Sequence, residues 1–418
     1  MDAREHVTET PPAPNHAGPL AGLKVVEFVG IGPGPMCGML LADLGAEVLR
    51  VDRVEPSGLG IERPQRFDLL LRGKRSLAVD LKQPAGLALA RALVARADAL
   101  IEGFRPGTME RIGLGPEACL AANPRLVYGR VTGFGQTGPL ATSAGHDLNY
   151  IALAGALHAI GRAGAAPTPP LNLIGDYAGG AMLLAFGIVA ALWNVKAGGR
   201  GQVVDAAMID GAAALMTPFF GLAAAGLHDG PRGTNLLDSG APFYEVYACA
   251  DGEFVSIAPI EAKFRRVLLE RLAAAGVAVG DLPDFDDRAR WPELRRRLSA
   301  IFAARTSAQW AEVLEGSDAC FAPVLSLRAA VGHPHHVERG SFVGIDGIEQ
   351  PAPAPRFSAT PAATPLAHEG AEDGRGWAAS WGVAGDVLDA GLGTAGVAAG
   401  APGDPAAAGG TDATKAAP

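Results

Sequence analysis

The chain has 418 residues, of which 19% are charged and 49% hydrophobic, with a formal net charge of −9. A chain of this length and composition can bury a large core and is expected to hold more than one domain. Its acidic balance argues against general binding to nucleic acid, while a local cluster of Arg and Lys can still bind an anionic ligand.

The first ordered elements form a strand–helix–strand unit. LKVVEFVG is expected to be a buried strand, IGPGPMCG a turn, MLLADLGA a helix and EVLRVD a second strand. The pattern recurs, because a helix over 86–97 precedes the strand ALIEGF and a helix near 116–122 precedes RLVYGRVTG. Strands that alternate with helices predict βαβ units, hence a parallel sheet in a doubly wound, Rossmann-like α/β domain.

The second half of the chain changes character. Residues 147–197 are expected to be helical around the loop GRAGAAPTPPLN, and 203–225 are again expected to be helical. From Asp238, short strands in APFYEVYACADGEFVSIAPI predict a small α+β domain. Its expected helices cover 264–274, 291–304 and 308–314.

These patterns predict six segments. They are a disordered leader (1–18), a large α/β domain (19–205), a helical linker (206–238), a small α+β domain (239–340), a segment returning to the large domain (341–382) and a mobile Ala/Gly-rich tail (383–418).

Nothing in the sequence indicates export or a membrane anchor. Residues 1–18 are polar, unlike the apolar segment of a signal peptide. The most apolar stretch, 181–193, is shorter than the about 20 residues that span a bilayer, so a buried helix is expected there. Four widely spaced cysteines without a CxxC pair indicate reduced, mostly buried thiols of a cytoplasmic protein. They are Cys37, Cys119, Cys249 and Cys320.

A glycine-rich turn invites a dinucleotide-binding interpretation that fails. Gly30, Gly32 and Gly34 lie between a strand and a helix, and Asp52 ends the next strand. The G-x-G-x-x-G fingerprint needs a third glycine where Pro35 stands. The turn is therefore either a plain tight turn or the site of a nucleotide ligand bound without the fingerprint, at the carboxyl ends of the strands.

His146, in AGHDLNY, is the first candidate for proton transfer, because an imidazole titrates near neutral pH. It lies where a helix should begin, so backbone N–H groups there, including that of Asp147, can receive a developing oxyanion. The residues alone equally allow an ordinary helix start with Asp147 as its cap.

Two carboxylates are further candidates, and each has a plain structural alternative. Asp176, in IGDYAGG, precedes an apolar helix, where an Asp usually caps the helix. Gly175, Gly179 and Gly180 would let substrate or backbone approach it closely. Glu261, in IAPIEAKF, is also consistent with a solvated acid at a helix start.

A histidine-rich tract is not interpreted as a metal site. No acidic residue or cysteine stands at a suitable spacing, and Pro334 interrupts any helical face, so a loop is expected. The histidines are His333, His335 and His336.

Several motifs in order resemble one known family. They are LKVVEF-x-G-x-x-PGP, LADLGAEVLRVDR, GKRSLAVDLKQPAG, IEGFRPGTMERIGLGP, TGFGQTGP, AGHDLNYIALAG, LNLIGDYAGG, GRGQVVDAAMIDG and GAPFYEVY-x-x-ADG. From about Leu20 to Ser358 the chain resembles the α-methylacyl-CoA racemases of the family III CoA-transferase (CaiB/BaiF) superfamily. The resemblance implies a CoA-binding large domain, an interlocked homodimer with active sites between large and small domains, and a 2-methyl-branched acyl-CoA substrate. It implies no separate cofactor, metal, nucleic acid or membrane.

The resemblance also assigns roles to residues. His146 matches the catalytic base, Asp176 the second proton carrier on the opposite face, and Glu261 the small-domain glutamate that orients the His across the dimer. The chain departs from the family near this glutamate, which puts its fine positioning in doubt. The departures are Pro259, Lys263 and Arg265.

CoA contacts follow from the same resemblance. Arg suits phosphate forks and adenine stacking, although each cation alone would pass for ordinary surface charge. The matching positions are Arg53, Val79, Asp80, Leu81, Lys82, Gly103, Phe104, Arg105, Arg111, Gly145, Asp147, Leu148, Asn149 and Tyr150, with Lys74 and Arg75 as further candidates.

Three functions remain to be compared. A racemase moves one proton between the faces of an enolate, whereas a family III CoA-transferase uses the aspartate at position 176 as a nucleophile. Transferases of this superfamily usually lack the His of GHD-x-NY and the small-domain glutamate, so His146 and Glu261 favour the racemase. The presence of both His146 and Asp176 argues against a protein that only binds CoA.

Overall fold

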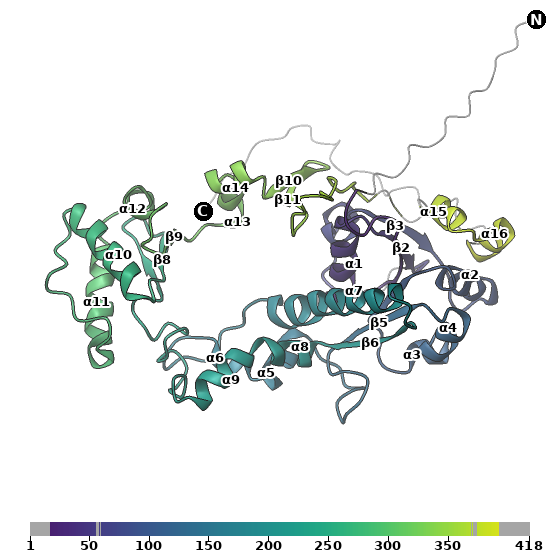
Figure 1. Cartoon of the computed structure of the whole chain (residues 1–418), viewed down its shortest axis with the longest axis horizontal. Helices are drawn as coiled ribbons and strands as arrows, with labels where there is room; N and C mark the ends of the chain where they lie inside the picture. Colours follow the sequence, from purple (N-terminus) through teal and green to yellow (C-terminus); the bar gives the residue numbers. More distant parts are fainter. Residues whose placement is uncertain (1–16, 56–57, 59, 369, 371–373, 393–418) are drawn as a thin grey trace, which may run out of the picture.

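The computed structural model describes residues 17–55, 58, 60–368, 370 and 374–392 (Figure 1). Its centre is a six-stranded sheet in the order β3-β2-β1-β4-β5-β6, and every pairing is parallel. This order, which reverses direction between β1 and β4, confirms the predicted doubly wound α/β class. The strands are β1 (Lys24–Phe28), β2 (Glu47–Asp52), β3 (Lys74–Ala78), β4 (Ala99–Glu102), β5 (Val127–Thr132) and β6 (Gln202–Ala207).

Two apolar layers enclose the sheet. Alternate residues of one strand face opposite sides, so Val25 contributes to one core and Val26 to the other. One face is covered by α1 (Pro33–Asp43) and α7 (Leu183–Lys196). The other face is covered by α2 (Pro84–Val94), α3 (Thr108–Arg111), α4 (Pro116–Ala122), α15 (Arg375–Ser380) and α16 (Gly385–Leu392).

The crossover from β5 to β6 carries most of the predicted helical region. It contains α5 (Asp147–Leu153), α6 (Ala156–Ala159) and the π-helix η3 (Leu173–Met182), which runs directly into α7. The helix expected over 203–225 is wrong at its start, because Gln202–Ala207 forms the edge strand β6. A short apolar run fits a strand as well as a helix, and periodicity alone cannot separate them. Helices α8 (Met208–Leu215) and α9 (Thr217–Ala224) follow β6.

The π-helix makes the apolar helix longer than the sequence predicted. Leu173–Lys196 is continuous over 24 residues, long and apolar enough for a membrane span by those two measures. The stretch 181–193, from which the sequence analysis judged the length of this apolar helix, therefore covers only part of it. Leu184, Ile188 and Val195 are nevertheless buried in the core beside the sheet, and a core helix of this kind meets the same two measures.

The small lobe has its own antiparallel sheet and core. β7 (Glu245–Ala248), β8 (Phe254–Ile257) and β9 (Phe321–Pro323) pair in that order. Trp310 and Phe302 are fully buried in the core between this sheet and its helices. The three predicted helices are confirmed as α10 (Ala262–Ala274), α11 (Trp291–Phe302) and α12 (Ser307–Leu314), and the single turn η4 (Arg288–Arg290) precedes α11.

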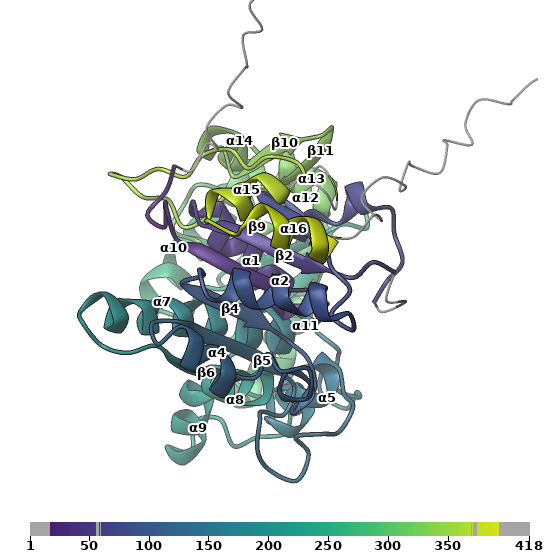
Figure 2. The ribbon, with the colours of Figure 1, turned by 90° about the vertical axis from the view of Figure 1, so that its right-hand side faces the viewer.

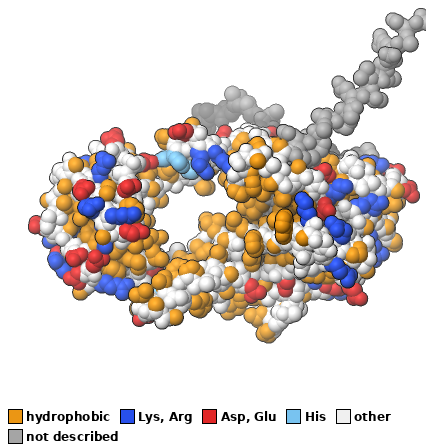
Figure 3. All heavy atoms as spheres, viewed as in Figure 1, with side chains coloured by type: hydrophobic (Ala, Val, Ile, Leu, Met, Phe, Trp, Pro, Cys, Tyr) orange, Lys and Arg blue, Asp and Glu red, His pale blue; other side chains and the backbone are white. Residues whose placement is uncertain are grey.

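Two connections join the lobes. One leaves α9, and the other runs through α13 (Leu327–Val331), α14 (Pro334–Arg339) and the hairpin of β10 (Phe342–Ile345) and β11 (Ile348–Pro351) (Figure 1). Figure 3 shows an opening through the molecule between these connections. The prediction of a loop around Pro334 is wrong. Pro334 occupies the first turn of α14, where the backbone N–H that proline lacks would have no partner within the helix.

The tail departs in part from expectation. Gly385–Leu392, predicted to be mobile, forms α16, which lies beside α2 (Figure 2) and buries Leu388 in the large core. Residues 393–418, and all of the predicted leader except Ala17 and Gly18, lie outside the described residues. The four cysteines are free thiols and three of them are buried, which confirms the prediction of unpaired, mostly buried thiols.

Candidate active site

His146 is held at the start of α5. The side-chain oxygen of Asn149 accepts the backbone N–H of His146 at 3.0 Å, and the His146 carbonyl accepts the N–H of Asn149 at 2.8 Å. This reciprocal pair fixes the His146 backbone in an extended conformation and leaves the residue exposed. The predicted helix start is confirmed, but the cap is His146, and Asp147 is the first residue of the helix.

Asp176 lies inside the π-helix η3, so it is not the helix cap that its sequence position allowed. Asn172 is the residue before the helix, and its side-chain amide donates to the Asp176 carboxylate at 3.0 Å. π-Helical segments are rare and occur often at functional sites. Asp176 is half-buried and therefore accessible from one side.

A buried carboxylate joins the two candidate bases. Oδ1 of Asp147 accepts the backbone N–H of Asp176 at 2.7 Å, which ties the start of α5 to η3. A Cβ on Gly175 would lie 2.6 Å from that oxygen, so this helix-to-helix contact requires glycine there. The glycines were expected to admit substrate or backbone; at Gly175 the close neighbour is a side chain, whereas a Cβ on Gly179 would lie 2.8 Å from the backbone nitrogen of Ala212, which confirms the expectation there.

The glycine turn after β1 also reaches the site. Gly32 has a φ of +69°, and a Cβ added there would lie 3.2 Å from Oδ2 of Asp176. Gly180 and Pro33 approach similarly, since a Cβ on Gly180 would lie 3.0 Å from Cβ of Pro33. The first turn of α1 therefore packs directly on η3 beside the Asp176 carboxylate.

The surroundings of Asp176 raise the pKa of its carboxyl group. Burial raises the pKa of Asp176 above its ordinary value, and the hydrogen bond from Asn172 opposes this shift. The nearby Asp147 charge raises the pKa further, whereas His146 lowers it. A raised pKa makes the carboxylate form a stronger base, which suits a group that must accept a proton and return it.

Tyr150 connects this pair to the neighbouring loops. Its hydroxyl donates to the carbonyl of Gly145, and its ring meets Phe134 edge-on at 5.0 Å between centroids. Burial raises the pKa of Tyr150 to about 12, and Asp176 adds to the shift, whereas Arg105 opposes it. The site thus includes the loop after β4 that carries Arg105.

The other expected CoA contacts follow neighbouring strands. Arg53 follows β2, the loop of Val79, Asp80, Leu81 and Lys82 follows β3, and the loop of Gly103, Phe104 and Arg105 follows β4. Because carboxyl ends of parallel strands share one edge of a sheet, these loops border the same region. Arg53, Lys82 and Arg105 are exposed, and none forms an ion pair with another residue in the described ranges.

A buried ion network supports the loop after β4. Arg130 of β5 donates to Glu102 at 2.6 Å and to Glu110 of α3 at 2.8 Å. The second oxygen of Glu102 accepts the backbone N–H of Phe104 at 2.8 Å. Burial raises the pKa of Glu102, while Arg130 and the Phe104 N–H oppose the shift. The network fixes the backbone immediately before Arg105 and the helix that carries Arg111.

The further CoA candidates at the start of β3 are wrong. Lys74 is fully buried and bonded to Glu27 at 2.5 Å, so it cannot reach a ligand in this structure. Arg75 packs on the ring of Trp377, at 5.6 Å from its centroid. Both residues lie at the amino end of β3, away from the edge that carries the loops.

Glu261 lies in the small lobe, as the residue before α10, and it is exposed. Among the described residues of one chain, no hydrogen bond or ion pair joins it to His146. One of its unusual neighbours has a different role, since Arg265 pairs with Asp286 at 2.7 Å and covers the ring of Phe243. Arg265, one of the three departures from the family pattern near Glu261, therefore stabilises the small lobe.

The histidine tract shows no metal-binding arrangement. His333 pairs with Glu315 at 2.7 Å, and the rings of His333 and His336 meet edge-on at 5.9 Å. Across the residues that the structure describes, no three His, Cys, Asp or Glu side chains gather as metal ligands would.

Two residues near Asp176 escaped the sequence analysis. Gly32 belongs to the turn that was examined only for nucleotide binding, although its place after a parallel strand already put it at the edge of the sheet where ligands bind. Asn172 stands four residues before Asp176, a spacing at which side chains of one helix meet, but this spacing alone did not single it out.

Comparison with known proteins adds the family context. The model of CoA-transferase family III matches residues 20–371. The mouse protein named alpha-methylacyl-CoA racemase is 47% identical over 82% of this chain and 87% of its own length. The succinyl-CoA–D-citramalate CoA-transferase of Chloroflexus aurantiacus is 34% identical over 82% of this chain and 89% of its own. A CaiB/BaiF family crystal structure from Brucella suis superposes with a TM-score of 0.72 at 27% identity, covering 87% of this chain and all of that one.

Proposed function

The chain belongs to CoA-transferase family III, and from this premise we propose that it is a 2-methylacyl-CoA racemase. It interconverts (2R)- and (2S)-2-methylacyl-CoA thioesters by moving one proton through an enolate. The observation that carries this proposal is the hydrogen bond from Asp176 to Asp147, which brings the helix start bearing His146 against the helix bearing Asp176. The higher identity to a racemase than to a transferase supports it.

The reaction uses two bases on opposite faces of the α-carbon. For one epimer His146 takes the α-proton and Asp176 delivers a proton to the other face, and for the other epimer the roles reverse. Charge develops on the thioester oxygen in between and is received by the backbone N–H of Asp147, the first residue of α5. The raised pKa of Asp176 suits this role, because the group must be base for one epimer and acid for the other.

CoA is bound through its phosphates and adenine at the carboxyl edge of the sheet. Arg53, Lys82 and Arg105 provide exposed positive charge on three adjacent loops, and Arg111 lies on α3 beside them. Charge-assisted hydrogen bonds to phosphate are the strong ones, so these contacts account for most of the affinity for the carrier. CoA is part of the substrate, and no further cofactor is required; activity that disappears with EDTA or depends on NAD would contradict this.

Each active site takes residues from two chains of an interlocked homodimer. The structure has an opening between the lobes (Figure 3), as an interlocked arrangement of two chains requires. Large apolar side chains of α7 and α9 are exposed, among them Phe186, Trp193 and Phe220, and they suit a partner's surface. Glu261 then reaches His146 from the partner, where a carboxylate on the imidazole fixes its tautomer.

One experiment tests the reaction directly. Each epimer of a 2-methylacyl-CoA is incubated with the protein in deuterated water, and the α-proton and the epimer ratio are followed by NMR. The racemase replaces the α-proton with deuterium and brings both epimers to near-equal amounts. If neither epimer loses its α-proton, the proposal is wrong.

A CoA-transferase is the second candidate, since the whole family shares this fold and a transferase relative is 34% identical. In that reaction the Asp176 carboxylate attacks the thioester carbonyl, the C–S bond breaks, and CoA leaves as a thiolate, with an acyl-aspartyl anhydride as product. Hydroxylamine or borohydride added during turnover then modifies Asp176. A racemase uses the carboxylate only to carry a proton and gives no adduct.

A further inference from the structure

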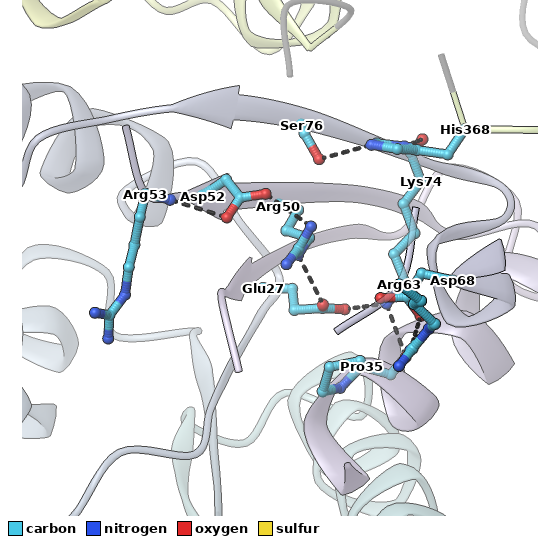
Figure 4. A network of polar contacts seen from close by, with 10 residues as sticks. All are labelled: Glu27, Pro35, Arg50, Asp52, Arg53, Arg63, Asp68, Lys74, Ser76 and His368. Atoms are coloured by element: carbon cyan, nitrogen blue, oxygen red, sulfur yellow. Dashed lines mark hydrogen bonds and ion pairs between the residues drawn. The ribbon is translucent and has the colours of Figure 1, made fainter. Parts of the chain in front are cut away.

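Four alternating charges are enclosed between the sheet and α1 (Figure 4). Lys74 of β3 pairs with Glu27 of β1 at 2.5 Å, Glu27 faces Arg50 of β2 at 3.7 Å, and Arg50 pairs with Asp52 at 2.7 Å. Lys74 and Glu27 are fully buried, and Arg50 is nearly so. None of these four side chains takes part in the proton transfer or the CoA contacts proposed above.

The Lys74–Glu27 pair fixes the beginning of α1. Nζ of Lys74 also donates to the carbonyl of Pro35 at 2.7 Å, within the first turn of the helix. One turn further on, a Cβ on Gly38 would overlap the Glu27 carboxylate and lie 2.9 Å from Nζ of Lys74. The helix backbone therefore rests on the ion pair itself, with no side chain between them.

The fixed turn of α1 is the one that packs against Asp176. Gly32 precedes α1 and lies three residues before Pro35, and its α-carbon faces Oδ2 of Asp176 closely enough that a Cβ would come within 3.2 Å. Movement of this turn toward η3 would push the carboxylate, and movement away would leave the hydrogen bond from Asn172 to hold it without the turn. A short path thus leads from Lys74 to the Pro35 carbonyl, along the first turn of α1 to Gly32, and across to the Asp176 carboxylate.

The other end of the network stops at a proposed CoA contact. Asp52 pairs with Arg50 through one carboxylate oxygen and accepts the backbone N–H of Arg53 at 2.9 Å through the other. The Arg53 side chain extends away from the network (Figure 4). The Arg53 end of the network is joined to Lys74 and Glu27 only by the 3.7 Å ion pair of Glu27 and Arg50. Lys74 is therefore linked more directly to Asp176 than to Arg53.

We propose that Lys74 and Glu27 are positioning residues for Asp176: by holding the first turn of α1, they set the place of the Asp176 carboxylate and not that of His146. This inference rests on the proposed racemase function. A buried ion pair is weak evidence for stability, because apolar side chains of similar volume often stabilise as well. By contrast, a lysine that donates to both a carboxylate and a helix carbonyl fixes the orientation of the helix turn, because hydrogen bonds are directional and apolar packing is not.

The two faces of the reaction make the proposal testable. Exchange of the α-proton is measured separately for each epimer, because one is deprotonated by His146 and the other by Asp176. In Lys74→Met, exchange from the epimer that depends on Asp176 should fall roughly tenfold to 100-fold, the range for a misplacement of about 1 Å. Exchange from the epimer that His146 serves should stay within about twofold of the parent, since α5 is held to the backbone of η3 by Asp147 and that hydrogen bond does not involve α1.

Two further variants protect the test against unfolding. Lys74→Met leaves the buried Glu27 with only the more distant Arg50, so the double variant Glu27→Gln/Lys74→Met removes both charges of the close pair and should show the same one-sided loss. Gly32→Ala leaves the ion pair intact and presses on Asp176 directly. Its matched control is Gly22→Ala, because Gly22 has a similar φ of +83° and nothing within 4 Å of an added Cβ.

The outcomes separate the inference from the function on which it rests. One-sided loss in Lys74→Met or the double variant and in Gly32→Ala, with Gly22→Ala unchanged, supports the proposal. Equal loss for both epimers, or a change in KM alone, would overturn it while leaving the racemase in place. A parent protein that exchanges neither epimer would overturn both.

Discussion

The backbone N–H of Asp176 is bound by the carboxylate of Asp147 at 2.7 Å, so one acidic side chain holds another acidic residue in place. The second oxygen of Asp147 is buried and has no hydrogen-bond partner among the described residues. A buried charge this close to Asp176 disfavours a second charge there, which is one reason why the pKa of Asp176 is raised.

Substitution of Asp147 should separate its hydrogen bond from its charge. Asp147→Asn keeps an acceptor oxygen but removes the charge that raises the Asp176 pKa, so the acid limb of the pH–rate profile should move to lower pH for the epimer that Asp176 deprotonates. Asp147→Ala also loses the acceptor and should destabilise the fold by about 1–3 kcal/mol. Rates as a function of pH and thermal unfolding of both variants test this, and an unchanged acid limb in Asp147→Asn would contradict it.

Asp176 should destabilise the folded protein when it is ionised. Its pKa is raised in the folded state, so its contribution to stability is greatest below the unfolded pKa and is lost as pH rises through the folded pKa. Asp176→Asn should therefore raise the melting temperature at neutral pH, and this gain should shrink as pH falls.

Glu293→Gln is the control of opposite sign. Hydrogen bonding to Arg290 lowers the pKa of Glu293, so its contribution is present above the unfolded pKa and is lost as pH falls. This substitution should lower the melting temperature at neutral pH, with an effect that fades in acid. Parallel melting curves over pH 3–8, on the order of the titration range of carboxyl groups, compare the two variants. If Asp176→Asn left the melting temperature at neutral pH unchanged or lowered it, the result would be inconsistent with the raised pKa of Asp176.

CoA recognition should depend on the cations at the carboxyl edge of the sheet. Arg53→Ala, Lys82→Ala and Arg105→Ala should each raise KM, because a charge-assisted hydrogen bond contributes about 1.5–3 kcal/mol. Arg125→Ala is the matched control, an exposed arginine just before β5 at the opposite edge. Steady-state kinetics and CoA binding by calorimetry measure the effect. Equal affinity in Arg53→Ala and Arg105→Ala would show that these positions do not contact the carrier.

Arg130 should influence affinity without contacting the substrate. Arg130→Met breaks the pair with Glu102 and releases the loop before Arg105, so KM for the thioester should rise while kcat at saturation stays near the parent value. Breaking a buried pair from one side also costs about 3–5 kcal/mol of stability. Arg297→Lys, in an exposed pair with Glu293, is the control that should change neither quantity. A fall in kcat with unchanged KM would point to a different role for Arg130.

Two inactive variants should restore each other if the active site is shared between chains. His146→Ala and Glu261→Ala proteins are unfolded, mixed and refolded together, since interlocked chains should not exchange when simply combined. Heterodimers then contain one site with both native residues, and activity should reappear. Heterodimers verified by mass spectrometry but still inactive would mean that the two residues act within a single chain.

The large domain could be predicted from the sequence because its signals are local. Four of the buried strands have runs of branched apolar residues and lie next to helices with their own period, so β1, β2, β4 and β5 were found near their observed limits. β3, with the sequence KRSLA, has no such run and was not predicted. β6 was missed because its residues also fit a helix, and its place in the sheet depends on pairing with β5. α14 was missed because Pro334 was interpreted as a helix breaker, although a proline is well tolerated in a first turn.

The candidate site could be predicted only in part. The resemblance identified His146 and Asp176, whereas spacing alone fitted ordinary helix caps equally well. Lys74 shows the limit most clearly, since a lysine in a basic motif is normally exposed, yet here it is fully buried against Glu27. Such a pairing joins β3 to β1 across β2, and no local pattern in the sequence reports it.

The position of α15 and α16 affects how the chain can fold during synthesis. The indole of Trp381 donates to the carboxylate of Glu47, 334 residues earlier in the chain, and α16 covers α2. A ribosome needs on the order of tens of seconds to make the intervening stretch. Until then, the apolar face of α2 that α16 covers in the folded protein stays partly exposed to solvent. The nascent chain therefore presents an apolar surface to which chaperones bind well before the large lobe is complete.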